Sequence, residues 1–267
     1  MPTYFNSFGV LQISGRDAAQ FLQGQISCDI NEVDEEHSLL GTCCDRKGRV
    51  LFSFRIFQKA EAYYLYLPKS MLEFAIAHLR KFIIIAKVSL DIKAFHCRGF
   101  GAEELEEWLS LHPMKTPKKW GEVRSNQTDS LILVDEKNTR YLALSEATDS
   151  EYTPTTLQEK DWEYLDILQG LVTIYPETQG LFIPQMLNYD QFGAISFTKG
   201  CFVGQEIVAR TQHLGKLKRH LHLLEKDTAL ERGAELLDEQ NQNCGTVVAC
   251  SLNPEGKYSV LAVLKDN

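Results

Sequence analysis

The sequence contains no apolar run long enough to cross a bilayer and no start typical of an export signal. A membrane-spanning helix needs about 20 apolar residues, whereas the apolar run at residues 82–86 is far shorter and predicts a buried strand. Residues 1–9 lack the basic start and the apolar stretch of a signal peptide. We therefore expect a cytoplasmic protein with no membrane partner.

Motifs of common catalytic and metal sites are also missing. There is no GxGxxG, P-loop or GxSxG pattern, and the seven cysteines have no zinc-type spacing. Without an export signal, these cysteines are most simply reduced thiols. Cys43 and Cys44 are adjacent, but strand alternation sends their side chains to opposite faces, which favours a structural role over a metal or redox site. No metal site is predicted.

The chain has no excess of positive charge. Lys and Arg number 28 against 36 Asp and Glu, and the formal net charge is −8. Binding along nucleic-acid phosphates needs a basic surface, so direct nucleic-acid binding is not expected. A direct nucleic-acid-binding module would rest on one local basic group alone. That group consists of Arg210, Lys216, Lys218, Arg219 and His220.

Helical and strand patterns interleave without regular βαβ spacing, which favours an α+β fold over a doubly wound sheet. Helices are predicted at residues 16–25, from Pro68 onward, at Ala102–Leu111 and at 155–169. The earlier strands are predicted at 4–13, 38–44, 49–57, 62–67, 130–134 and 140–144, with two β-rich pieces between 83 and 97. After a boundary near 215–218, three short strands at 220–224, 244–250 and 258–264 predict a small all-β module or barrel.

The densest group of chemically useful residues is the segment 199–206, Lys-Gly-Cys-Phe-Val-Gly-Gln-Glu. Gly200 and Gly204 remove side chains where a backbone turns sharply or approaches another group. Between them, Cys201 is a candidate functional thiol, and Lys199 would favour its thiolate. The alternative is a buried, inert cysteine. Gln205 and Glu206 are expected to hold the loop through backbone N–H groups, and a catalytic role for them has no stronger support than this structural one.

A second candidate group surrounds the predicted helix at 155–169. A flat heterocycle needs aromatic or apolar walls and a few amides or carboxylates to read its N–H edge. Trp162, Tyr175, Glu177 and Gln185 provide these side chains. The alternative is a core tryptophan and tyrosine with surface polar residues, and from the pattern alone that alternative is favoured.

The pattern at 199–206 resembles the signature of the YgfZ-type folate-binding proteins, relatives of the glycine-cleavage T protein (aminomethyltransferase). Other segments match the same family in order along nearly the whole chain. They are 21–25 with Asp29, 45–49, 182–185 with Asn188, 195–197, 209–210 and 218–219. Phe202 stands where the family has a tyrosine.

The resemblance implies a T-protein-like fold of three modules with ferredoxin-like character and a C-terminal β-barrel. Residues 1–214 would form the aminomethyltransferase-like folate-binding region, whose two α+β modules include a second one near 85–150. Residues 215–267 would form the barrel. Tetrahydrofolate or a related folate would sit in a central cavity. Trp162 and Phe8 match positions of folate-contacting tryptophans in the family, and Arg210 is a further expected contact.

The same resemblance implies a folate-binding accessory factor for the assembly or repair of iron–sulfur proteins, which affects tRNA modification indirectly. Its partners would be iron–sulfur client or assembly proteins. The alternative is a folate-dependent one-carbon transferase of the T-protein type. Phe52 and Ser53 stand where the T protein has adjacent aspartates, so no carboxylate is there to assist proton transfer. We therefore do not expect aminomethyltransferase activity.

Overall fold

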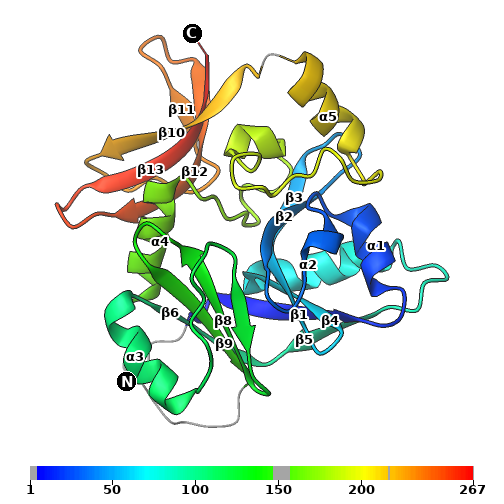
Figure 1. The fold of residues 1–267 in the computed structure, drawn as a ribbon. Coiled ribbons are helices and arrows are strands. Elements are labelled where there is room, and N and C mark those ends of the chain that lie inside the picture. Colours follow the sequence, from blue (N-terminus) through cyan, green and yellow to red (C-terminus); the bar gives the residue numbers. More distant parts are fainter. Residues whose placement is uncertain (1–4, 147–156, 216, 267) are drawn as a thin grey trace. The chain divides into compact units, whose positions relative to one another are not determined.

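The computed structural model describes residues 5–146, 157–215 and 217–266, and these residues form three sheets with helices beside them (Figure 1). Strands and helices follow no regular βαβ repeat, so the α+β prediction is confirmed. The chain forms two compact units, each built from three segments. Unit 1 comprises Met1–Leu22, Ile30–Leu39 and Phe54–Trp162, and unit 2 comprises Gln23–Asp29, Leu40–Ser53 and Glu163–Asn267.

The first sheet has the strand order β2-β3-β4-β1-β5. Its strands are β1 (Phe8–Ser14), β2 (Leu39–Cys44), β3 (Val50–Lys59), β4 (Ala62–Pro68) and β5 (Ser89–Lys93). The helices α1 (Ala18–Gln25) and α2 (Lys69–Arg80) and a short 3₁₀ turn, η1 (Ile30–Glu32), belong to the same stretch of chain. Strand β1 pairs antiparallel with both β4 and β5. Helix α2 packs on β1 and β4 through buried residues at helical spacing, which are Met71, Leu72, Ala75, Ile76 and Leu79.

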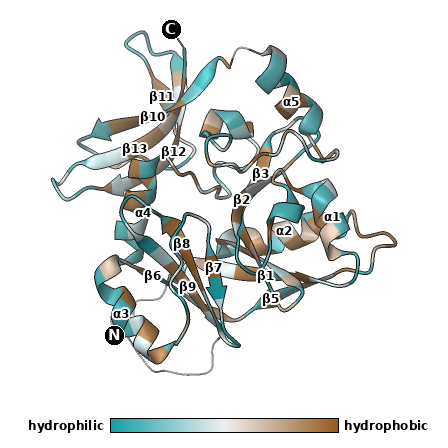
Figure 2. Ribbon diagram, in the orientation of Figure 1, coloured by the Kyte–Doolittle hydropathy of each residue, from teal (hydrophilic) through white to brown (hydrophobic). Residues whose placement is uncertain are grey.

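The middle sheet has the strand order β6-β9-β8-β7 and belongs to unit 1. Its strands are β6 (Phe95–Phe100), β7 (Val123–Ser125), β8 (Asp129–Asp135) and β9 (Arg140–Glu146). Helix α3 (Ala102–Leu111) has the predicted bounds and packs against β6 and β9. Its Leu105 and Trp108 are buried while Glu103, Glu106 and Glu107 are exposed, a division that Figure 2 shows as alternating brown and teal along the helix.

The C-terminal sheet of unit 2 has the strand order β10-β13-β12-β11. Its strands are β10 (Arg219–Lys226), β11 (Glu235–Leu237), β12 (Asn243–Leu252) and β13 (Tyr258–Lys265). The prediction of three β-segments here is confirmed, but within the described residues no pairing joins β10 to β11, so the expected closed barrel is not observed. The physical reason is the short β11, which covers three residues and pairs only with β12, with a register shift between Leu236 and Leu237.

The remaining elements of unit 2 lie between the sheets in the sequence. They are α4 (Glu159–Gln169), which begins in unit 1, a 3₁₀ turn named η2 (Pro184–Leu187) and α5 (Gln205–Leu214). The predicted start of α4 at residue 155 lies outside the described residues. None of the helices in the described part of the chain is long and apolar enough to cross a membrane. The predicted boundary at residues 214–215 stays a prediction.

The strand predicted at residues 82–86 is wrong. Helix α2 ends at Arg80, and the next residues form a turn in which Phe82 N–H donates to the Leu79 carbonyl at 3.0 Å. The following strand, β5, begins only at Ser89. The apolar run is therefore a surface loop, in which Ile84 and Ile85 are exposed.

Candidate functional site

The segment 199–206 forms a loop that leads into α5, and Gly204 is the residue that its geometry requires. Gly204 has a φ of +84° and precedes the first residue of the helix. A Cβ at this position would lie 2.4 Å from the carbonyl oxygen of Asp45 and 3.0 Å from the Cα of Gly48. A Cβ added at Gly200 would have no atom within 4 Å. The loop is thus in close backbone contact with the turn at 45–48, a contact that joins two motifs of the sequence.

Lys199 links the loop to residues 26–28 of unit 2 by hydrogen bonds. Its side chain is buried, and its Nζ donates to the carbonyls of Ile26 at 2.9 Å and Cys28 at 2.8 Å. Burial lowers the pKa of Lys199 to about 8, although the nearby Cys28 and Asp29 act in the opposite direction. The ammonium thus serves two backbone carbonyls, and its expected effect on Cys201 stays a prediction.

The other polar residues of the loop differ in their roles. Gln205 Oε1 accepts a hydrogen bond from Phe202 N–H at 3.2 Å, which is a contact of the expected structural kind. Glu206 is exposed in the first turn of α5, where a negative charge is favourable. A further hydrogen bond, from Val203 N–H to the Gly24 carbonyl at 3.2 Å, links the loop to the end of α1. The loop is therefore an ordered platform.

Cys201 is the exposed thiol among the seven cysteines, all of which are described. Cys43 and Cys44 are fully buried, and burial raises the pKa of the Cys44 thiol to about 12. Burial likewise raises the pKa of Cys97 to about 12. These three thiols are neutral at pH 7 and closed to solvent. Cys201, by contrast, is a thiol that solvent and reactants can reach.

The 182–188 segment of unit 2 places Gln185 against α5. Gln185 is buried, and its Nε2 donates to the Val208 carbonyl at 2.6 Å. Its Oε1 is buried and has no hydrogen-bond partner among the described residues. An unpaired buried acceptor is costly, so this atom calls for a donor from a water or a ligand. The residue before this segment is linked to the turn that precedes β3, because Arg49 Nη1 donates to the Leu181 carbonyl at 2.7 Å.

A second arrangement in unit 2 contains a residue that sequence reasoning missed. The guanidinium of Arg232 lies 4.1 Å from the ring centre of Tyr175 and pairs with Glu163. The Nε of Arg232 is buried without a partner among the described residues. Glu177, two residues after Tyr175, is exposed, and its carbonyl approaches Gly233. No local motif around residue 232 signals this contact, because it joins chain segments far apart in the sequence.

The two predicted aromatic contacts of unit 1 lie in or beside its core. Trp162 is 6% exposed and packs so tightly on Gly99 that a Cβ there would lie 2.3 Å from the ring. Arg140 lies over the same ring at 4.6 Å. Phe8 is half-buried and stacks on Tyr66 with ring centres 4.7 Å apart. The packing of Trp162 agrees with the core alternative, and a role of either ring in ligand binding stays a prediction.

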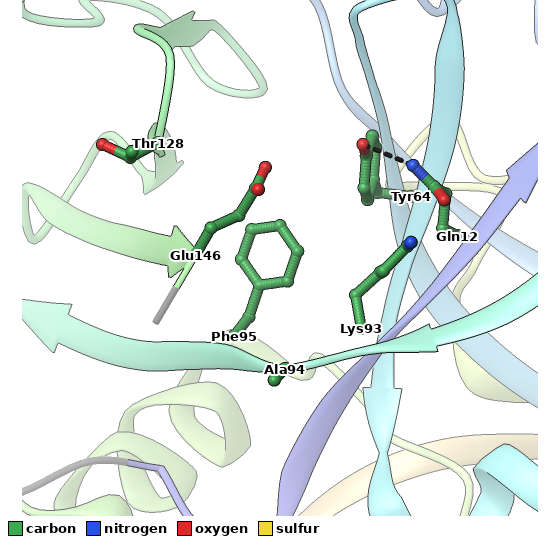
Figure 3. Close-up of a pocket in the computed structure, with 7 residues that line it drawn as sticks. All are labelled: Gln12, Tyr64, Lys93, Ala94, Phe95, Thr128 and Glu146. Atoms are coloured by element: carbon green, nitrogen blue, oxygen red, sulfur yellow. Dashed lines mark hydrogen bonds between the residues drawn. The ribbon is translucent and has the colours of Figure 1, made fainter. Parts of the chain in front are cut away.

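Unit 1 also contains a cavity of about 330 Å³ that no motif indicated. Figure 3 shows the Phe95 ring between Glu146 and Lys93, with Gln12 linked to Tyr64. Gln12 Nε2 donates to the Tyr64 hydroxyl at 2.7 Å. Glu146 pairs with the buried Lys59 at 2.9 Å, and Lys93 is the cation among the residues that line the cavity.

The local basic group predicted from the sequence is only partly described, because Lys216 lies outside the described residues. Arg210 on α5 and Lys218 are exposed, and Arg219 is half-buried. His220 Nε2 lies 3.4 Å from a carboxylate oxygen of Asp266, which reduces the positive character of this group when the histidine is protonated.

No protein-family model matches the sequence. The chain is 31% identical over 278 residues to the tRNA-modifying protein YgfZ of Colwellia psychrerythraea, with 98% of this chain and 84% of the relative covered. A protein of the same name from Hamiltonella defensa is 31% identical over 273 residues, with 97% and 81% covered. The crystal structure of the glycine cleavage system aminomethyltransferase T from Bartonella henselae matches with a TM-score of 0.77 at 13% identity, over 98% of this chain and 77% of that one. This last likeness concerns the fold alone.

Proposed function

The chain belongs to the YgfZ family, and from that premise we propose that it binds a folate and acts as an accessory factor for iron–sulfur proteins. Its effect on tRNA modification would then be indirect, through an iron–sulfur enzyme. The observation that carries the proposal is the ordered loop 199–206, which presents the exposed Cys201. A thiolate is a competent nucleophile and a soft-metal ligand, and both properties suit work on iron–sulfur clusters.

The side chains of unit 2 fit a folate chemically. A pterin ring presents N–H donors along one edge, and the buried, unpaired Oε1 of Gln185 is an acceptor of the required kind. The ring of Tyr175 suits a flat heterocycle. Arg232 lies beside the same ring, pairs with Glu163 and keeps an unpaired Nε–H, which is a donor for an acceptor atom of the pterin. Phe8, Trp162, Glu177 and Arg210 remain further proposed contacts, and a bound tetrahydrofolate would supply one-carbon carrier chemistry.

Calorimetric titration with tetrahydrofolate under anaerobic conditions tests the proposal. We expect saturable binding by the wild type and at least tenfold weaker binding by Tyr175→Leu. Tyr258→Leu is the matched control, because Tyr258 is a half-buried tyrosine in the C-terminal sheet. Absence of binding by the wild type would contradict the proposed function. Equal binding by Tyr175→Leu and the wild type would contradict the site alone.

A one-carbon transferase is the second candidate, because the fold resembles that of an aminomethyltransferase. Phe52 and Ser53 oppose it. Phe52 is fully buried, and the Ser53 hydroxyl accepts a hydrogen bond from Ile174 N–H at 2.9 Å. Neither side chain can take a proton as a carboxylate does. Formation of methylene-tetrahydrofolate from the aminomethyl-loaded carrier protein, at enzymatic rates, would favour this candidate over the accessory role.

A further inference from the structure

The loop between α2 and β5 carries the most exposed large apolar side chains of the described chain. Ile84 is 86% exposed and Ile85 is 93% exposed, whereas no other large apolar residue in the described ranges exceeds 56%. Figure 2 shows this loop as a brown stretch beyond α2. Scattered apolar residues are normal on a surface. Two adjacent isoleucines almost wholly in water instead mark a candidate interaction site.

The first half of this loop is fixed to the end of α2. Phe82 N–H donates to the Leu79 carbonyl at 3.0 Å, and Ile83 N–H donates to the Arg80 carbonyl at 3.2 Å. The Phe82 ring lies 5.3 Å from the ring of His78 on the same helix. The helix therefore sets the direction in which the isoleucines leave the surface of unit 1.

The second half is fixed to the segment before α1. Lys87 N–H donates to Oδ2 of Asp17 at 2.7 Å. The Lys87 carbonyl approaches Gly15 so closely that a Cβ there would lie 2.2 Å from the oxygen, and Gly15 has a φ of +113°. With both ends anchored, the loop loses little conformational freedom when a partner binds its tip.

Exposed cations flank the isoleucines on both sides in the sequence. Arg80, Lys81 and Lys87 are exposed, and within the described residues none of them takes part in an ion pair. The nearby carboxylate of Asp17 pairs with Arg16 at 3.5 Å. The tip is therefore apolar at its centre and positive at its rim, on a chain whose net charge is −8.

We infer that residues 80–87 form a docking tip for a partner protein whose surface offers an apolar pocket rimmed by carboxylates. This inference rests on the proposed function, because an accessory factor must contact the iron–sulfur client or assembly proteins it serves. The pocket would take Ile84 and Ile85, and its rim would meet the three cations. Such charge complementarity speeds association and selects the partner.

Two other occupants fit the observations less well. In a two-fold dimer the same patch meets itself, so the cations of both copies would face one another. An anionic bilayer would repel the acidic remainder of the molecule over roughly a Debye length of 8 Å, whereas a pocket meets only the tip. A stable interface buries about 800 Å² on each partner. Two side chains bury far less than that, so the docking tip suits a transient complex.

Site-specific photo-crosslinking in cells provides the first test. A benzophenone amino acid replaces Ile84, and the control replaces Leu237, which is 56% exposed in the other unit. The protein captured at position 84 is then purified, and its affinity for the intact chain is measured. We expect Ile84→Ser/Ile85→Ser to weaken this binding at least tenfold and Lys81→Gln/Lys87→Gln to reduce its salt dependence. The matched control Leu237→Ser/Leu252→Ser should bind as the wild type does.

Several results would overturn the docking tip. They are a cross-link no stronger at position 84 than at 237, an adduct of two copies of this chain, and unchanged affinity of the isoleucine variant. Co-sedimentation of the wild type, but not of that variant, with phosphatidylcholine–phosphatidylglycerol vesicles would assign the tip to lipid. Tetrahydrofolate titration separates the two proposals, because the isoleucine variant should bind the folate normally. A wild type that binds the captured partner as expected but no folate would contradict the proposed function alone.

Discussion

Replacement of Gly204 by alanine tests whether the loop 199–206 depends on its contact with the turn at 45–48. The new Cβ would lie 2.4 Å from the Asp45 carbonyl oxygen and 3.1 Å from the Cβ of Cys44. Both neighbours are held, because the Asp45 carbonyl accepts from Gly48 N–H at 2.9 Å and Cys44 is fully buried. The backbone of the loop must therefore move.

The expected cost has two parts. Holding a residue other than glycine at a φ of +84° costs about 1–3 kcal/mol, and forcing an extra carbon into a packed contact costs about 1–3 kcal/mol. Lower entropy of the unfolded chain offsets about 0.4–1 kcal/mol. Gly204→Ala should therefore lower the free energy of unfolding by about 2–5 kcal/mol. That loss is a large fraction of the whole free energy of unfolding of an ordinary domain.

Chemical denaturation followed by circular dichroism measures this loss, and Gly200→Ala is the control within the same motif. No atom lies within 4 Å of a Cβ at residue 200, so Gly200→Ala should stay within about 0.5 kcal/mol of the wild type. A Gly204→Ala variant as stable as the wild type would refute the reasoning. Equal losses in both variants would show that the close approach to Asp45 is not the cause.

Three further predictions concern single side chains. Cys201→Ser should melt close to the wild type, because the thiol is exposed, yet fail to restore iron–sulfur enzyme activity in a deletion strain; full restoration would show that the thiol is dispensable. The pKa of Lys199 is lowered from 10.5 to about 8 in the folded chain, so between these values the unfolded chain binds more protons and stability rises with pH. Relative to Lys199→Met, the wild type should therefore gain about 3 kcal/mol across that window, and parallel pH profiles would contradict the assignment. Arg140 pairs with Asp135 at 3.0 Å where both are buried, so Arg140→Met should cost about 3–5 kcal/mol in a denaturation experiment; a loss below 1 kcal/mol would mean that Asp135 finds other partners.

Local patterns predicted those features that depend on neighbouring residues. Helix α3 has the predicted bounds because its apolar positions, Leu105 and Trp108, recur at helical spacing among four glutamates. The motif 199–206 was found because its glycines and its cysteine stand close together in the sequence. Its Gln205 does hold the loop, through Phe202 N–H.

Features that join distant segments could not be predicted in this way. The close approach of Gly204 to Asp45 and the stacking of Arg232 on Tyr175 depend on the tertiary fold. The apolar run at 82–86 was wrongly assigned to a strand because burial was inferred from residue type alone. Anchors at Leu79 and Lys87 place that run on the surface instead, and no local signal distinguishes the two outcomes.

The segmented make-up of unit 2 has a consequence for synthesis on the ribosome. Its segment Leu40–Ser53 is made 110 positions before Glu163, where the main part of the same unit begins. At about 5–20 residues per second, the ribosome needs about 5–20 s to cover that distance. During this interval Cys43, Cys44 and Val50, which are fully buried in the finished protein, have none of their later partners from 163–267. The strands β2 and β3 can pair with their sheet neighbours during this time, but these side chains lack their later cover from 163–267, and such transient exposure favours aggregation.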